Sequence, residues 1–349
     1  MKKILAMLIT LCFVLVMVGC NGADSGNNEP AETETAEVAE GEGRTLTLGF
    51  SWAHKNDTLF FAMFDTVNAA VEETMGAHGF DEVEWINVIS GANAQIQAND
   101  IEDLIARGVD AIVVYAFDNV AIGSSIESAQ EAGIPIILYD RPADASVTQP
   151  DAFVGLDTVA QAYDAGVVFF QMLEDEGVEP NNIISIIGDL ADQNALNRIE
   201  GFDRAAAEFG HEISVTVPSE WDSDVALANF TTAWQANSDS NVVIIASDFI
   251  ITAVQSVLEA NNAWHPMGHE DHVWILAQDA FPIGLQFVRD GYIAVQGVYN
   301  LEGMADLFQS VLWGLLAGEE VPPYQTVGAG IMTIENVDTQ TWWAHAYED

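Results

Sequence analysis

Charged, amide and aromatic side chains recur in this sequence where apolar, strand-like runs end. Asp140 and Arg141 directly follow the apolar run at 134–139, although the chain of 349 residues has only nine Lys and Arg. A charged pair beside a buried strand loses its hydration and needs partners that replace the water. The position of Arg141 therefore indicates a binding site that needs a rigid hydrogen-bond donor.

Similar groups follow most of the other predicted strands. They are Trp52, Asn56, Asp57, Phe60, Phe61 and Asp118 in the first half, and Asp192, Asn194, Arg198, Trp221, Ser247, Asp248, Gln278, Asp279, Tyr299 and Asn300 in the second. Carboxylates accept hydrogen bonds, guanidinium groups donate them in a fixed fork, and amides do both. Flat aromatic faces suit the apolar C–H faces of a pyranose ring. This combination predicts a site for a neutral, polyhydroxylated ligand.

Ordinary structural roles compete with this interpretation at four positions. An Asp after a strand is often the N-cap of the next helix, which is the alternative for Asp118 and Asp248. Trp221 could belong to the hydrophobic core, and Arg198 could form a purely structural ion pair. The sequence alone leaves these alternatives open.

The elements that must position these groups alternate along the chain. Strands are predicted at 45–52, 83–90, 111–116, 134–139, 152–157, 183–189, 213–219, 242–247, 273–279 and 292–299, with helical periodicity between most of them. Short apolar strands that alternate with helices predict parallel sheets covered on both faces. Two successive blocks of this kind predict an α/β fold with two lobes. In such sheets the ligand lies beyond the carboxyl ends of the strands.

The first 20 residues are typical of a secretory signal peptide. Two lysines precede the apolar run at 4–18, and Gly19 and Cys20 follow it. A small residue before Cys at this point resembles the bacterial lipobox, so we expect a lipid on Cys20. An uncleaved membrane anchor is the alternative.

Residues 21–44 are polar, acidic and free of aromatic side chains, which predicts a disordered tether. Cys12 leaves with the signal peptide, and the chain has only two cysteines. The folded body therefore has no thiol for a disulfide, a metal site or a nucleophile.

Net charge is the strongest compositional signal. The chain has 54 Asp and Glu against nine Lys and Arg, a formal net charge of −45. Nucleic-acid binding needs a basic surface and is excluded. Such self-repulsion destabilises a compact state unless salt screens it, so we expect a halophilic protein. An acidic surface that recruits a cationic partner is the alternative.

Five stretches resemble the type I periplasmic sugar-binding proteins, in particular the ribose, xylose and galactose group. These stretches are IEDLIARGVDAIVVYAFDN, AGIPIILYDRP, VGLD, ADQNALNRIEGF and AQDAFPIGLQFVRDG, and YDR and DQNALNR look most like the xylose-binding branch. The resemblance implies a type I periplasmic-binding-protein fold, with two doubly wound parallel-sheet lobes joined by a three-crossing hinge. The implied lobes are 45–157 plus 301–326, and 158–300 plus 327–349.

The resemblance also implies which residues bind the ligand. They are Asp57, Phe61, Asp140, Arg141, Asp192, Asn194, Arg198, Trp221, Asp248, Asp279 and Asn300. Two departures affect ligand identity: Ser247 stands where relatives often have Asn, and the loop around Asn56, Asp57 and Thr58 has an unusual length. No metal or cofactor is implied.

The implied function is that of a monomeric, lipid-anchored, extracytoplasmic subunit that captures a monosaccharide and delivers it to the membrane subunits of an ABC importer. An aldopentose such as xylose is favoured over an aldohexose. The alternatives are a sensor for a sugar or furanose signal that docks to a membrane receptor such as a chemoreceptor, and a nucleoside-binding protein.

Two other interpretations are weaker. The chain has no Gly-x-Ser-x-Gly motif and no phosphate-binding loop. Asp140 and Asp279 could be imagined as a glycosidase pair, but the neighbouring Arg and amides favour binding, so we do not expect an enzyme. The loop at 265–272 contains three His, Glu270 and Asp271, and its sequence leaves open whether it is a solvated loop or a weak metal site.

The charge imbalance predicts stability that depends on salt. We expect the protein to lose compactness at low salt and to melt cooperatively in molar KCl, because the Debye length falls to about 3 Å at 1 M. Circular dichroism melting across a KCl series measures this effect. Sucrose serves as the control, since it is excluded from protein surfaces without screening charge. A cooperative melting curve that does not change with salt would contradict the halophile prediction.

Overall fold

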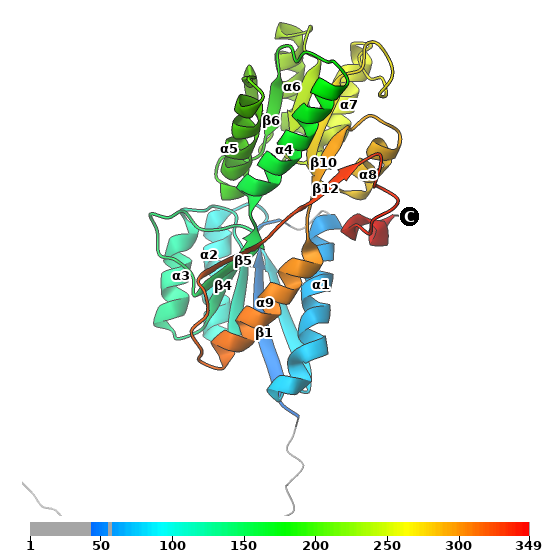
Figure 1. Ribbon diagram of the computed structural model, residues 1–349. Coiled ribbons are helices and arrows are strands. Elements are labelled where there is room, and N and C mark those ends of the chain that lie inside the picture. Colours follow the sequence, from blue (N-terminus) through cyan, green and yellow to red (C-terminus); the bar gives the residue numbers. More distant parts are fainter. Residues whose placement is uncertain (1–42, 55–57, 349) are drawn as a thin grey trace, which may run out of the picture. The chain divides into compact units, whose positions relative to one another are not determined.

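The computed structural model describes residues 43–54 and 58–348. The predicted signal peptide, the lipidation site Cys20, nearly all of the tether, and the candidate ligand residue Asp57 lie outside the described residues. Among the described helices, none is both long and apolar enough to cross a membrane. The strands form two six-stranded sheets, each covered by helices (Figure 1).

The first sheet has the strand order β11-β5-β4-β3-β1-β2, and all its pairs are parallel. Its strands are β1 (Thr45–Trp52), β2 (Glu82–Ile89), β3 (Ala111–Tyr115), β4 (Ile136–Tyr139), β5 (Ala152–Leu156) and β11 (Tyr324–Val327). Its helices are α1 (Thr58–Thr74), η1 (Met75–His78), α2 (Ala94–Arg107), α3 (Ile122–Glu131) and α9 (Leu301–Leu316).

The second sheet has the order β12-β10-β9-β8-β6-β7 and is parallel except for the antiparallel pair of β10 and β12. Its strands are β6 (Ile184–Ile187), β7 (Val215–Pro218), β8 (Val242–Ile245), β9 (Trp274–Asp279), β10 (Val295–Val298) and β12 (Gly330–Thr333). The remaining helices are α4 (Thr158–Asp175), α5 (Gln193–Glu208), α6 (Ser223–Ala236), η2 (Asp248–Ile250), α7 (Ile251–Ala260), α8 (Pro282–Arg289) and η3 (Trp343–Tyr347). The predicted fold class is confirmed.

The chain passes three times between the two sheets. The first passage lies between β5 and α4, where the Asp157 side chain caps α4 by accepting a hydrogen bond from the backbone of Ala160. The second lies between β10 and α9, where Asn300 caps α9 in the same way. The third joins β11 to β12 through residues 328–329. We propose these passages as the boundaries between the lobes, as expected from the sequence.

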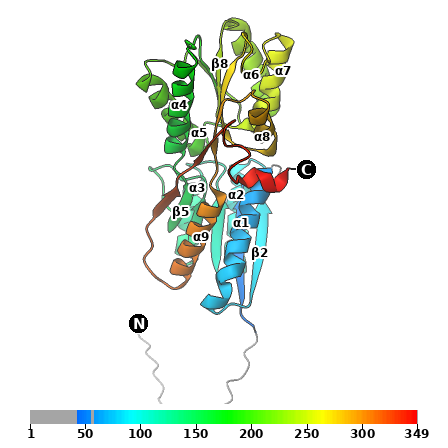
Figure 2. The same cartoon turned by 45° about the vertical axis from the view of Figure 1, so that its right-hand side comes forward.

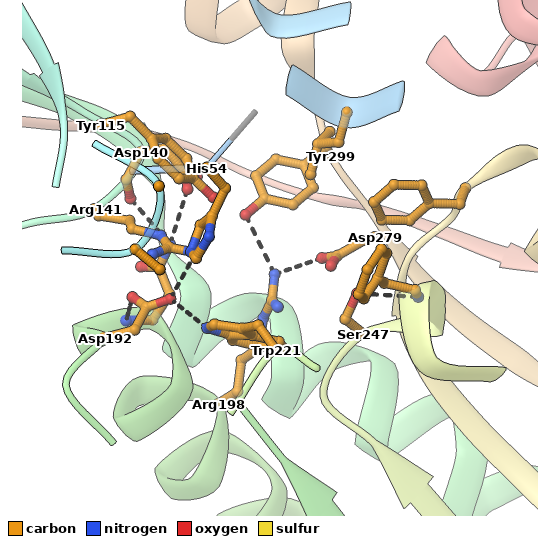
Figure 3. Close-up of a pocket in the computed structure, with 16 residues that line it drawn as sticks. His54, Tyr115, Asp140, Arg141, Asp192, Arg198, Trp221, Ser247, Asp279 and Tyr299 are labelled. Carbon is orange, nitrogen blue, oxygen red and sulfur yellow. Dashed lines mark hydrogen bonds and ion pairs between the residues drawn. The ribbon is translucent and has the colours of Figure 1, made fainter. Parts of the chain in front are cut away.

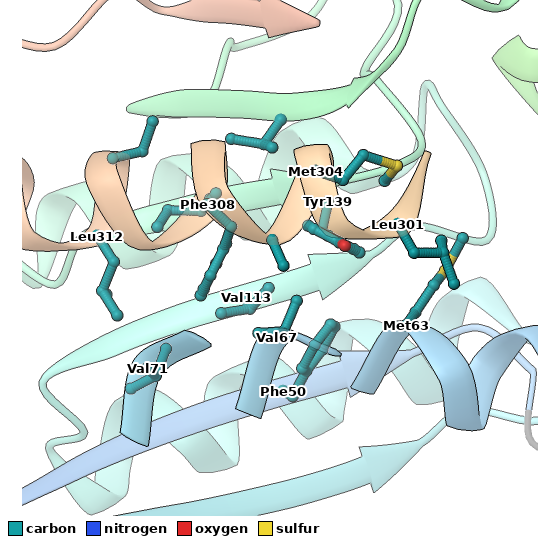
Figure 4. Close-up of a cluster of buried hydrophobic side chains, with 14 of the residues drawn as sticks. Phe50, Met63, Val67, Val71, Val113, Tyr139, Leu301, Met304, Phe308 and Leu312 are labelled. Carbon is teal, nitrogen blue, oxygen red and sulfur yellow. The ribbon is translucent and has the colours of Figure 1, made fainter. Parts of the chain in front are cut away.

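The core of the first lobe is formed by chain segments that lie far apart in sequence. Val67 of α1 and Phe308 of α9 pack with Phe50 and Tyr139 of the sheet, and all four side chains are fully buried (Figure 4). Tyr139 meets the Phe308 ring edge-on, with ring centroids 5.8 Å apart. The first sheet therefore needs a helix that follows the second lobe in the chain.

The second lobe depends on a close crossing of α4 and α5. A Cβ atom built on Gly201 would lie 2.5 Å from the carbonyl oxygen of Val159 and 2.6 Å from the Ala162 Cβ. Real Cβ atoms do not approach other atoms this closely, so only glycine fits. The pair of helices carries Arg198, and its spacing therefore affects the position of that side chain.

Gly201→Ala should destabilise the protein by about 1–3 kcal/mol, the usual cost of overpacking a close contact. The matched control is Gly76→Ala, because nothing lies within 4 Å of a Cβ atom at Gly76. Urea unfolding of the two variants measures the difference. Equal free energies of unfolding would show that the α4–α5 crossing is looser than described.

Candidate functional site

A cavity of about 340 Å³ lies between the carboxyl ends of the two sheets (Figure 3). It is lined by His54, Leu59, Gly91, Ala92, Tyr115, Asp140 and Arg141 on the side of the first sheet, and by Asp192, Asn194, Arg198, Trp221, Ser247, Phe249, Asp279, Phe281 and Tyr299 on the other. The lining groups are carboxylates, guanidinium groups, an amide and aromatic rings. Both lobes therefore contribute to one polar cavity with aromatic walls.

Arg141 links the two lobes. Its Nη2 atom lies 3.1 Å from Asp192 Oδ2, and its guanidinium group stacks on the Tyr115 ring at 4.3 Å. Its Nη1 donates to the carbonyl of Ala116 at 3.3 Å. The Nε–H is buried and has no hydrogen-bond partner among the described residues.

Asp140 follows β4 in a left-handed backbone conformation, with φ of 69°. The Nδ2 of Asn194 donates to the backbone carbonyl oxygen of Asp140 at 3.0 Å and to the Asp140 carboxylate at 3.2 Å. The side chain is completely buried, and its Oδ1 has no partner within the described chain. Burial raises the pKa of Asp140 to about 7, although Arg141 opposes the shift.

Arg198 is the corresponding cation of the second lobe. Its Nη2 lies 2.5 Å from Asp279 Oδ1, and its Nη1 donates to the carbonyl of Ala246 at 2.7 Å. The Gln161 side chain accepts from both Nε and Nη2. Burial raises the pKa of Asp279, and Arg198 opposes that shift. Both cations of the cavity are therefore paired with a carboxylate.

Trp221 forms part of the aromatic wall. Its Nε1 donates to Asp192 Oδ2 at 3.0 Å, so one carboxylate holds both Trp221 and Arg141. The indole lies against Gly188, where an added Cβ atom would be 2.0 Å from the ring. The absence of a side chain at Gly188 thus allows the indole to reach the cavity.

Seven of the predicted site residues line this cavity: Asp140, Arg141, Asp192, Asn194, Arg198, Trp221 and Asp279. Phe61, Asp248 and Asn300 do not. Phe61 is 52% exposed, and Asn300 caps α9. Asp248 is fully buried behind the wall, where it accepts from the backbone N–H of Phe281 at 2.9 Å. Helix capping thus accounts for Asn300 and the contact with the Phe281 backbone for Asp248, whereas Phe61 lies on the solvent side of α1.

The structural alternatives have mixed outcomes. Asp118 accepts from the backbone N–H groups of Val120 and Ala121 in the turn before α3, whereas the N-cap residue of α3 is Ala121, so the N-cap interpretation is wrong. Arg198 has its predicted ion pair and also faces the cavity, so the two interpretations are compatible. Trp221 packs against the core of the second lobe while it lines the cavity.

Several lining residues were not among the predicted ligand residues, namely His54, Tyr115, Ser247, Phe249, Phe281 and Tyr299. Ser247 and Tyr299 appeared among the polar groups after strands, but the family pattern directed attention to Asp248 and Asn300 beside them. Tyr115 ends β3, so the strand-end rule could have found it. Burial and the nearby Arg141 lower the pKa of His54 to about 4, which keeps its imidazole neutral at pH 7.

The histidine-containing loop lies away from this cavity. Ligand atoms of His265, His269 and Asp271 lie within 4.8 Å of one another. The two imidazole rings stack nearly parallel, with centroids 3.9 Å apart and an interplanar angle of 13°. Nitrogen lone pairs lie in the ring plane, so in this arrangement they point side by side and do not converge on one ion. The geometry gives no support to a metal site here.

Asp140→Asn should remove a pH-dependent part of the stability. The folded pKa of about 7 exceeds the ordinary value of 3.8. The contribution of Asp140 is therefore fully present below the ordinary pKa and is lost as the pH rises through the folded one. At about 1.4 kcal/mol per pKa unit, the wild-type stability should fall by a few kcal/mol relative to the variant between about pH 4 and pH 8.

Urea unfolding at a series of pH values measures this difference. Glu73→Gln is the control, because Glu73 is an exposed carboxylate of α1. Its curve should run parallel to that of the wild type. A wild-type curve parallel to that of Asp140→Asn would mean that Asp140 titrates normally.

Residues 48–320 match the family described as periplasmic binding protein domain. The chain is 27% identical over 314 residues to the xylitol-binding protein of Mycolicibacterium smegmatis, a match covering 87% of this chain and 85% of that one. It is 28% identical over 232 residues to the D-apiose import binding protein of Paraburkholderia graminis, covering 66% and 70% of the two chains.

Solved structures show the same architecture. The ABC transporter solute binding protein from Bacillus halodurans C-125, with bound myo-inositol, is 22% identical with a TM-score of 0.72, covering 85% of this chain and 98% of that one. At this identity the comparison supports the fold. Together with the family match over most of the chain, it confirms the resemblance predicted from the sequence, and the chain belongs to the family of periplasmic binding proteins with the type I fold.

Proposed function

We propose that this protein captures a neutral monosaccharide between its two lobes and delivers it to the membrane subunits of an ABC importer. The observation that carries the proposal is the pairing of each buried Arg in the cavity with a carboxylate. Arg141 pairs with Asp192, and Arg198 pairs with Asp279. These pairs leave oxygen acceptors and N–H donors side by side, as hydroxyl groups require.

The charge of the cavity favours a neutral ligand. Two guanidinium groups face the carboxylates Asp140, Asp192 and Asp279. Because the pKa of Asp140 is raised to about 7, the set lies between neutral and singly negative at physiological pH. A sugar phosphate or sugar acid would need surplus positive charge there. The proposed ligand is therefore an uncharged polyol or aldose, and no catalytic role is proposed.

The size of the cavity and its aromatic lining narrow the range of possible ligands further. A cavity of about 340 Å³ lies at the small end of the range for ligand pockets, which suits a single sugar ring. Trp221, Tyr115 and Tyr299 offer flat faces for C–H groups. The names of the relatives mention xylitol and D-apiose, both five-carbon compounds. We keep xylose as the first candidate, followed by ribose, galactose or glucose, and arabinose.

Contacts between the lobes suggest how ligand binding favours closure of the lobes. Asn194 and Asp192 of the second lobe contact Asp140 and Arg141 of the first. A ligand that bonds to both sets favours the closed arrangement by its differential affinity. The closed protein would then present one matched surface to the importer.

The predicted location is part of the same proposal. We propose that the protein works outside the cytoplasmic membrane as a monomer held by a lipid on Cys20 and an acidic tether. A sensor that docks to a membrane receptor would use the same closed form, so it remains the second candidate. Nucleosides and furanose signals form the third candidate class of ligands.

Arg141→Ala should weaken sugar binding by roughly 10- to 150-fold, since a hydrogen bond to a charged group contributes about 1.5–3 kcal/mol. The ligand is first identified by thermal shift of the wild type in molar KCl with xylose, ribose, galactose, glucose, arabinose, xylitol, myo-inositol, a furanose sugar and nucleosides. Calorimetry with that ligand then compares wild type and variant.

The matched control is Arg204→Ala. Arg204 is an exposed arginine of the same helix as Arg198, and its only salt bridge among the described residues is with Glu200. Arg141→Lys is the fallback if the alanine variant does not fold, because it keeps a charge for Asp192 and loses the planar fork. Unchanged affinity in both Arg141 variants would exclude Arg141 from the site. A shift with nucleosides alone would overturn the sugar proposal.

A further inference from the structure

The last described residues pack against both lobes. We call residues 342–348 the C-terminal strap. Trp342 and Ala344 are buried in the core of the second lobe, whereas Trp343 and Tyr347 also pack against the core of the first. Figure 2 shows this segment, in red, beside the end of α1 and below α8. The strap therefore joins the two lobes outside the three chain passages.

Trp343 holds the backbone of a cavity residue. Its Nε1 donates a hydrogen bond of 2.9 Å to the carbonyl oxygen of Asp279. Its ring also meets the ring of Phe281 edge-on, with centroids 5.7 Å apart. Asp279 and Phe281 both line the cavity, whereas Trp343 does not. Trp343 thus acts on the site from behind its wall.

The segment that Trp343 holds is strained. Asp279 and Ala280 have φ values of 85° and 63°, which residues with a Cβ atom rarely adopt. Such conformations persist only where surrounding contacts enforce them. Asp248 supplies one such contact by accepting the N–H of Phe281 at 2.9 Å, and Trp343 supplies another. Together with the Arg198 ion pair and the pairing of Asp279 with Val298 in the sheet, they fix the direction in which the Asp279 side chain enters the cavity.

The strap is attached to both lobes. Arg289 of α8 donates to Glu348 of the strap at 3.1 Å and to Asp338, just before the strap, at 2.7 Å, which ties the strap to the second lobe. The Tyr347 hydroxyl donates to Asp65 Oδ2 of α1 at 2.8 Å, which ties it to the first lobe. An opening that moves α1 away from the strap would stretch or break this last hydrogen bond.

We propose that the C-terminal strap couples the shape of the cavity to lobe closure. Trp343 is a positioning residue for Asp279, and the hydrogen bond between Tyr347 and Asp65 holds the strap on the first lobe in the closed arrangement. The expected effect of the strap on sugar affinity rests on the proposed function. Its expected effect on the backbone conformation at Asp279 is independent of that function.

Trp343→Phe tests the positioning role because it removes the indole N–H and keeps an aromatic ring. Trp342→Phe is the matched control, since the neighbouring Trp342 Nε1 has no hydrogen-bond partner among the described residues. We expect Trp343→Phe to bind xylose or xylitol about three- to tenfold more weakly, the value of one neutral hydrogen bond. The control should bind normally.

Amide hydrogen exchange of the ligand-free protein gives a second readout. Peptides that contain residues 279–282 should exchange faster in Trp343→Phe than in Trp342→Phe, because the strained turn has lost the hydrogen bond to the Asp279 carbonyl oxygen. This result does not depend on sugar binding. If the wild type binds no sugar, the proposed function fails while exchange still tests the strap. Equal exchange in the two variants would overturn the positioning role.

The attachment to the first lobe is tested by a double-mutant cycle of Tyr347→Phe and Asp65→Ala, which remove the donor and the acceptor of this hydrogen bond. Each variant should raise the dissociation rate of xylose or xylitol about three- to tenfold, as expected for loss of one hydrogen bond. The double variant should be no worse than either single variant. Additive effects would show that the two side chains act independently and would overturn the coupling.

Discussion

Burial of charge between two lobes is the constraint on which the rest of this structure depends. Arg141 and Arg198 are almost completely inaccessible to solvent, and a buried guanidinium group is tolerated only with close partners. Asp192 reaches Arg141 from the opposite lobe, and Asn194 reaches Asp140. The polar groups that line the cavity are therefore held in place by hydrogen bonds between the lobes. The geometry of the cavity follows from the hydrogen bonds and the ion pair that join polar groups of one lobe to those of the other.

Much of this could be predicted from the sequence because it is local. Apolar runs followed by helix-forming segments predicted the positions of the strands, and charged residues directly after those runs predicted the position of the cavity. Asp140 and Arg141 were found in this way, since no ordinary packing role explains a charged pair after a buried strand. The edge strands β11 and β12 were not predicted as strands. Their residues are mostly half-exposed, so they lack a continuous apolar run.

The rest of the site depends on contacts between distant segments. His54 comes from a loop with no periodic pattern, and the backbone of Phe281 is held by Asp248, 33 residues away in the chain. The Phe60-Phe61 pair predicted an aromatic side chain at the site, but α1 leaves Phe61 in solvent. Orientation around a helix end and contacts made across more than 30 residues are tertiary properties, which a strand-end rule cannot supply.

The discontinuous lobes also affect how the chain can fold. The first lobe lacks Phe308 of α9 and the edge strand β11 until residues 158–300 of the second lobe have been synthesised. Contacts between segments some 250 residues apart carry a large loop-closure entropy and form slowly. A partly synthesised chain consequently cannot complete its first hydrophobic core. The architecture itself therefore postpones completion of the first hydrophobic core until α9 and β11 have been synthesised.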